Sequence, residues 1–102
     1  MTLGIRAAAM ILLAASIAGT AFAQTRGEDI YKEKCVRCHD ADGLAATPVA
    51  RSRNILSFKA PEIMKWSDAQ LTDFTTKANK GIGLTDAQIK DVVAYIRTLQ
   101  KK

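Results

Sequence analysis

The sequence predicts an all-α domain of three to four short helices, and three observations lead to this class. Apolar residues recur at spacings of three and four in three segments of the chain. Two of these segments begin with a Ser or Thr that is followed three positions later by Gln, which is the pattern of a helix capping box. No segment alternates polar and apolar residues with a period of two over a useful length, so strands are not expected.

The first 23 residues predict a cleaved signal peptide. Arg6 is followed by a continuous run of small and apolar residues, which ends in Ala21-Phe22-Ala23, an A-x-A cleavage pattern. An uncleaved membrane anchor is the alternative, but the run is short for a span of about 20 residues. We therefore expect cleavage after Ala23, export to the bacterial periplasm, and a single mature domain over residues 24–102 with no stable membrane insertion.

The domain that remains has 79 residues, which is a poor size for a self-sufficient core. Stable domains of about 70–80 residues usually contain disulfides, a metal or a cofactor. Without Arg6 the chain keeps 14 of its 15 Lys and Arg against 10 Asp and Glu, a net charge of +4. The basic residues are spread along the chain and no aromatic stacking platform is visible, so nucleic-acid binding is not expected. This charge favours docking to an acidic protein or an anionic surface.

The first predicted helix runs from about Arg26 to Cys35. Ile30 and Tyr31 supply its apolar face, and Glu28 and Asp29 lie in the first turn, where the helix dipole favours negative charge. A loop over residues 40–60, rich in Ala, Gly, Ser and Arg, is predicted to follow. Loops of this length are uncommon in compact domains, so we expect a large rigid ligand to order it.

Three further helical segments follow the loop. A short turn is predicted to start at Pro61, because proline fits the first position of a helix. Ser67 and Gln70 form the first capping box, and Thr85 and Gln88 form the second. The apolar stripes behind the two boxes consist of Leu71, Phe74 and Ala78 in one helix, and Ile89, Val92, Val93, Ile96 and Leu99 in the other.

The stretch "CVRCH" contains the only two cysteines and the only histidine of the chain. A thioredoxin-like dithiol requires a βαβ context, and a zinc site requires four ligands, of which only three are available. The remaining interpretation is haem attachment, in which Cys35 and Cys38 form thioether bonds and His39 binds the iron. The two cysteines lie one helical turn apart, so both reach one edge of the porphyrin, and His39 can then fold under the ring.

The chain resembles the small class I c-type cytochromes, and the resemblance covers essentially all of Arg26 to Leu99. "GEDIYKEKCVRCH" resembles the N-terminal helix of that family, and "LTDAQIKDVVAYIRTL" resembles its C-terminal helix. The resemblance implies a cytochrome c-like fold, with three to four short helices around one covalently bound haem c per chain.

The resemblance also implies roles for individual residues. The two terminal helices are expected to cross near Gly27, where a side chain would prevent close approach, and Tyr95 is expected to pack at the crossing. Pro48 resembles the proline whose carbonyl accepts a hydrogen bond from the haem-ligating histidine, a bond that fixes the imidazole ring. "MKWSDAQL" is similar to the stretch that enters the family's third helix, which implies that Trp66 lies near a haem propionate.

The chain departs from the family's pattern at the second axial ligand of the iron. Many class I members carry a methionine in the loop before the last helix, but here that loop reads "KANKGIGLTD". Once the leader is removed only Met64 remains, and a thioether is a suitable soft ligand opposite histidine. We predict Met64 as the sixth ligand, and the alternatives are Lys77, Lys80, Asn79 or an open position.

These expectations separate two functions. With six ligands from the protein and the porphyrin, the iron cannot bind substrate, and the protein is a periplasmic carrier of single electrons between redox partners with acidic docking surfaces. With an open or weakly ligated sixth position, the same scaffold binds a small molecule such as a diatomic gas. Catalysis is not expected, because His39 is the only histidine and no second one is left as a distal base. The domain is expected to be a monomer.

Overall fold

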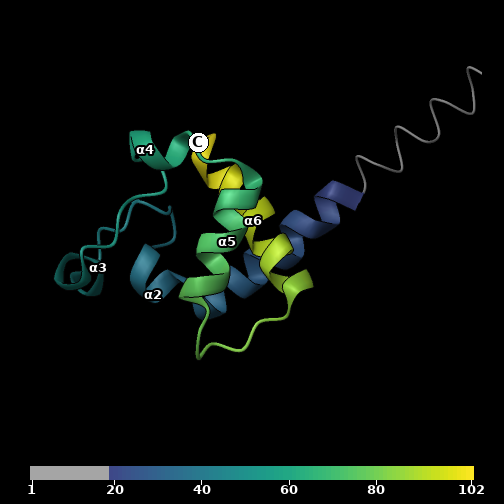
Figure 1. Ribbon diagram of the computed structural model, residues 1–102, viewed down its shortest axis with the longest axis horizontal. Helices are drawn as coiled ribbons and strands as arrows, with labels where there is room; N and C mark the ends of the chain where they lie inside the picture. Colours follow the sequence, from purple (N-terminus) through teal and green to yellow (C-terminus); the bar gives the residue numbers. More distant parts are fainter. Residues whose placement is uncertain (1–18) are drawn as a thin grey trace, which may run out of the picture.

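The computed structural model describes residues 19–102, and this part of the chain consists of helices, turns and loops, with no strand (Figure 1). The all-α prediction is confirmed, but the described residues contain six helices and not the three to four expected. An N-terminal helix is described over residues 19–34. The elements that follow it are α2 (Val36–His39), α3 (Pro48–Arg53), α4 (Pro61–Met64), α5 (Asp68–Ala78) and α6 (Asp86–Gln100). Over the same range, no helix combines the length and the apolar character that crossing a membrane requires.

The predicted leader lies mostly outside the described residues, and only its last five positions belong to them. These positions are helical and continuous with the first helix of the domain, so the prediction that this helix starts at Arg26 is wrong. The physical reason is local. Ala21 and Ala23 are strong helix formers, and no proline separates them from Arg26.

The predicted loop over residues 40–60 contains a helix that the sequence analysis missed. Thr47 precedes α3 and its hydroxyl accepts a hydrogen bond from the Ala50 backbone N–H at 3.0 Å. Pro48 occupies the first helical position, where its missing N–H costs nothing. A Thr cap followed by Pro is a helix-start signal, but α3 has only six residues, too few for an apolar period to stand out.

The two longest C-terminal helices begin where the sequence predicts. Both capping boxes are complete: the Ser67 side chain accepts from the Gln70 backbone at 3.1 Å, and the Thr85 side chain accepts from the Gln88 backbone at 3.2 Å. In each box the Gln side chain accepts from the cap residue's own N–H in return. α5 packs against α6 (Figure 1), and α4 begins at Pro61 as predicted.

The N-terminal helix crosses α6 at Gly27. A Cβ at residue 27 would lie 2.6 Å from the Asp91 carbonyl carbon and 3.1 Å from the Tyr95 Cβ, so only glycine permits this approach. Tyr31 and Tyr95 meet edge to face beside the crossing, with ring centroids 5.3 Å apart. The crossing expected from the resemblance is therefore confirmed.

The core lies where the N-terminal helix, α5 and α6 meet. Its fully buried members include Tyr31, Leu71, Ile89, Val92 and Leu99. The loop before α4 is tied to this core through Phe58, whose carbonyl accepts a hydrogen bond from the buried Gln100 amide at 2.9 Å. Phe58 also donates its backbone N–H to the Gly43 carbonyl at 2.9 Å. These contacts hold the loop above α5 and α6.

Candidate functional site

The cysteines and the histidine of the CVRCH stretch lie on one short turn of helix. The Cys35 N–H still bonds to the Tyr31 carbonyl at 2.8 Å, and the Cys35 carbonyl accepts from Cys38 at 3.2 Å and His39 at 2.9 Å. Both thiols are free and half-buried. Burial raises the pKa of the Cys35 thiol, and the neighbouring Cys38 adds to the effect.

Three hydrogen bonds fix the end of α2. The Tyr31 hydroxyl donates to the Asp40 carbonyl at 2.6 Å, the Thr47 hydroxyl donates to the Cys38 carbonyl at 2.9 Å, and the Ala45 N–H donates to the His39 carbonyl at 3.0 Å. They satisfy carbonyls that a helix end leaves without intrahelical partners. The backbone leaves the helix at Asp40 with a φ of 68°, so the turn after His39 is sharp.

The His39 ring is held on one side by the Phe58 ring. The two rings are stacked, with centroids 4.7 Å apart and planes 17° from parallel. Burial lowers the pKa of His39, which favours the neutral imidazole that binds metals. Its Nδ1 is buried and has no hydrogen-bond partner among the described residues. A buried nitrogen without a partner costs free energy, and the resemblance had implied a hydrogen bond from the histidine to the Pro48 carbonyl.

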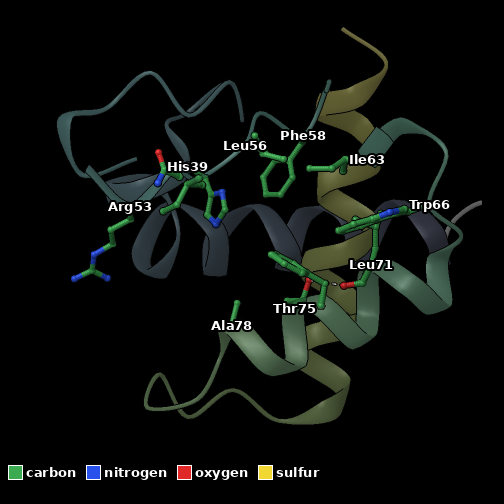
Figure 2. A pocket seen from close by; sticks show the side chains of 12 residues that line it. His39, Arg53, Leu56, Phe58, Ile63, Trp66, Leu71, Thr75 and Ala78 are labelled. Carbon is green, nitrogen blue, oxygen red and sulfur yellow. Dashed lines mark hydrogen bonds between the residues drawn. The ribbon is translucent and has the colours of Figure 1, made fainter. Parts of the chain in front are cut away.

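His39 lies at the junction of two adjoining pockets. Figure 2 shows the first, with the His39 and Phe58 rings above Thr75 and Ala78 of α5. The cavity volumes are about 330 Å³ and 390 Å³, within the range of pockets that hold small ligands and cofactors. The residues common to both pockets are His39, Arg53, Ile55, Phe58, Phe74, Thr75 and Ala78.

The second pocket brings the motif together with the connection between α5 and α6. Its lining includes Cys35 and Cys38 on one part and Ile82 and Leu84 on another. Three large apolar side chains that are otherwise exposed contribute to the walls of the pockets: Leu56 at 51 %, Phe74 at 46 % and Ile82 at 40 % exposure. Exposed apolar walls around a concave site are typical of a surface that a ligand covers.

A covalently attached haem fits these residues. Two free thiols lie on the lining of an apolar pocket, one helical turn apart, and the His39 imidazole, which lines the same pocket, follows them directly. Within the described residues, no group of three or more His, Cys, Asp or Glu side chains is arranged to hold a metal ion by itself. The donor set therefore suits a metal that arrives inside a porphyrin.

The other predicted site residues lie at different distances from the pockets. Trp66 lines the first pocket and packs on Phe74, with ring centroids 5.3 Å apart (Figure 2). Pro48 begins α3 and lines neither pocket, and its carbonyl does not bond to the His39 Nδ1. Met64 ends α4, is 45 % exposed and lines neither pocket. The hydrogen bond expected between His39 and the Pro48 carbonyl is therefore absent from this structure, and the place of Trp66 near a haem propionate and coordination by Met64 stay predictions.

The alternative sixth ligands in and before the loop after α5 differ in whether they line a pocket and whether their side chains already have partners. Asn79 lines the second pocket, but its side chain bonds the Leu84 carbonyl at 3.3 Å and the Leu84 N–H at 3.2 Å. Lys80 is exposed and lines the same pocket. Lys77 lines neither pocket and pairs with Asp73 at 2.9 Å.

The sequence analysis missed several residues of the pocket walls, among them Phe58, Arg53 and Ile82. Phe58 lies outside every periodic segment, so only its place in the fold brings it to His39. Ile82 lies in the loop before the last helix, where many class I members carry their axial methionine. Its position in that loop was the signal that could have identified it as a pocket residue.

The family model described as Cytochrome c matches residues 24–100 of this chain. The match takes in every residue that lines the two pockets. Comparison with curated proteins found no significant match. Comparison with solved structures found none either.

Proposed function

Since this chain belongs to the cytochrome c family, we propose that it carries single electrons between redox proteins in the periplasm, through one covalently attached haem c. The family as a whole supports a haem-based electron carrier. The observation that carries the proposal is the half-buried imidazole of His39 directly after the free thiols of Cys35 and Cys38, on the wall of an apolar pocket.

Each residue of the motif has a definite part in this function. Cys35 and Cys38 would hold the porphyrin edge through thioether bonds, and His39 would bind the iron. The haem supplies a one-electron couple between ferric and ferrous iron. The stacked Phe58 ring and the hydrogen bonds at the end of α2 hold the imidazole in place. A rigid, apolar surrounding keeps structural rearrangement small when the charge changes.

The charges around the pockets favour an acidic partner. Lys34 and Lys80 line the second pocket, and Arg53 lines both. All three are exposed, as is Arg37 inside the motif. An acidic protein surface would therefore meet positive charge where the haem edge is closest to solvent, which speeds association and orients the complex. We propose no catalytic step, because the one histidine of the chain is assigned to the iron.

The test is to produce the full chain in a bacterium that attaches haem c outside the cytoplasm. We expect a periplasmic protein that begins at Gln24, retains haem under denaturing conditions and is reduced and reoxidised by one electron per chain. The matched control is Cys35→Ala with Cys38→Ala, which should lose the covalent haem. Wild-type protein that stays free of haem, or remains in the cytoplasm, would contradict the proposal.

A further inference from the structure

The connection between α5 and α6 brings an apolar wall to the second pocket. Ile82 and Leu84 of this connection line the same pocket as Cys35, Cys38 and His39. Neither side chain has an atom that binds iron. The only methionine in the described part of the chain, Met64, lies on α4 and contributes to neither pocket.

The hydroxyl and amide groups that line this pocket already have partners. The Tyr31 hydroxyl donates to the Asp40 carbonyl at 2.6 Å, and the Thr75 hydroxyl donates to the Leu71 carbonyl at 2.7 Å. The Asn79 amide is bonded twice to the Leu84 backbone. These hydrogen bonds hold each of the three side chains against the backbone.

Apart from Cys35, Cys38 and His39, the remaining polar lining consists of cations. Lys34, Arg53 and Lys80 are all exposed, so water solvates their charged ends. Protonated ammonium and guanidinium groups donate hydrogen bonds and have no lone pair to offer a metal. A cation in water is therefore a poor source of a permanent sixth ligand.

Ile82 has a defined position in this wall. It lies between Gly81 and Gly83, whose φ angles of 92° and 84° form a tight turn that favours glycine. The Ile82 N–H donates to the Asn79 carbonyl at 2.8 Å, and the two bonds between Asn79 and Leu84 close the turn. The turn therefore presents the Ile82 side chain to the pocket from a fixed backbone.

We infer that the haem face turned away from His39 receives no ligand from the protein and is covered by the apolar side chains of Ile82 and Leu84. This inference rests on the haem attachment proposed above, and it is compatible with electron transfer, because a haem without a sixth protein ligand still changes between ferric and ferrous iron. A site of this kind binds a small neutral molecule with affinity for ferrous iron, because the side chains beside it are apolar. Binding is a reversible association, in which the ligand donates an electron pair to the iron and no electron is transferred between reactants.

Carbon monoxide is the probe, added to the reduced, haem-loaded protein at neutral pH. We expect it to bind and to shift the visible spectrum without prior unfolding. Met64→Ala should leave the spectra and the carbon monoxide affinity unchanged. A reduced haem protein that does not bind carbon monoxide would overturn the inference, and recovery of binding in Met64→Ala or Lys80→Ala would identify the ligand responsible.

A second variant supplies the missing thioether. Ile82→Met nearly conserves side-chain volume, so the turn should tolerate it. We expect a low-spin ferric spectrum with a methionine–iron charge-transfer band, and an affinity for carbon monoxide lower by about tenfold or more. The matched control is Leu44→Met, because Leu44 is exposed and lines neither pocket. Unchanged spectra in Ile82→Met would overturn the placement of Ile82 at the iron.

The two proposals fail in different ways. A chain that acquires no covalent haem contradicts the proposed electron carrier, and this is visible before any carbon monoxide is added. A chain that holds haem and is reversibly reduced, but excludes carbon monoxide, contradicts the open position alone.

Discussion

Gly27 lies against the backbone of Asp91, so close that a Cβ at residue 27 would stand 2.6 Å from the Asp91 carbonyl carbon. The Asp91 carboxylate also forms an ion pair with the Arg26 guanidinium at 3.0 Å, on the solvent side of the crossing. Two helices far apart in sequence are thereby brought into backbone contact. The helix that contains Gly27 leads directly into Cys35, so the crossing determines where the CVRCH stretch lies.

The first prediction concerns this contact. In an open helix Gly→Ala stabilises by up to about 1 kcal/mol. At residue 27 the added methyl must displace the backbone of α6, so we expect Gly27→Ala to lower the free energy of unfolding by about 1–3 kcal/mol. Chemical denaturation of the haem-loaded protein measures this. Asp29→Ala, at an exposed site on the same helix, is the control and should change stability by less than about 0.5 kcal/mol. Equal stability in wild type and Gly27→Ala would contradict the close approach.

The parts of the fold that the sequence predicted are those with a local cause. The boxes at Ser67 and Thr85 are short-range hydrogen-bond patterns, and the structure has both. The stripe behind Thr85 is long enough for its period to identify the buried face of α6. α3 was not predicted, because its six residues are too few to show an apolar period, although Thr47 and Pro48 are helix-start signals.

The site could be predicted only in part, for a related reason. The motif residues Cys35 and His39 are adjacent in sequence, so their proximity needed no fold. Phe58 reaches His39 through the hydrogen bonds that tie it to Gly43 and Gln100, which are long-range contacts. The exposure of Met64 likewise depends on which side of α4 faces the core, and a helix of four residues leaves that undecided in the sequence.

The second prediction concerns the Tyr31 hydroxyl. It supplies the 2.6 Å hydrogen bond to the Asp40 carbonyl at the end of the motif. Tyr31→Phe should lower the free energy of unfolding by about 0.5–1.5 kcal/mol, because the half-buried Asp40 carbonyl loses one of its two partners and keeps only the Gly43 N–H. Tyr95→Phe is the matched control, since the Tyr95 hydroxyl forms no hydrogen bond within the described residues. A loss in Tyr95→Phe as large as that in Tyr31→Phe would assign the effect to the ring cluster instead.

The third prediction is the pH dependence of this group. Burial is the main cause that raises the pKa of Tyr31 above its ordinary value, with the nearby Cys35 as the next cause. The folded protein therefore keeps the phenol proton at a pH where the unfolded chain, with a tyrosine pKa of about 10, loses it. Between these two values the unfolded chain binds fewer protons, so stability falls as pH rises. We expect unfolding free energy to decline more steeply above pH of about 10 in wild type than in Tyr31→Phe. Parallel profiles would contradict the assignment.

The fourth prediction is that the fold depends on the cofactor. Leu56, Phe74 and Ile82 are substantially exposed when nothing covers the pocket walls. A domain of this size has little stability in reserve, so these surfaces need a common partner. Cys35→Ala with Cys38→Ala, produced in the periplasm, should give little folded protein by circular dichroism and rapid digestion by protease. A helical, protease-resistant double variant would refute the dependence.

The last prediction concerns electrostatic docking at the pocket edge. Small charged redox reagents can test it in place of the natural partner. Lys34 and Lys80 lie on the lining of the pocket that contains Cys35 and Cys38, so they lie close to the edge through which an electron would leave. Reduction of the anion hexacyanoferrate(III) should slow as ionic strength rises, because salt screens charges over about 8–10 Å. Oxidation by a cationic cobalt(III) complex should instead become faster.

The decisive variants neutralise the charge locally. Lys34→Gln with Lys80→Gln should lower the rate with the anion and flatten its dependence on salt. Lys90→Gln with Lys101→Gln is the matched control, because both lysines are exposed and line neither pocket. The two pairs remove the same net charge, so a purely global field would make them equivalent, whereas local docking makes only the first pair slow. Equal rates in the two double variants would therefore count against a basic docking surface at the haem edge, even if both rates depended on salt.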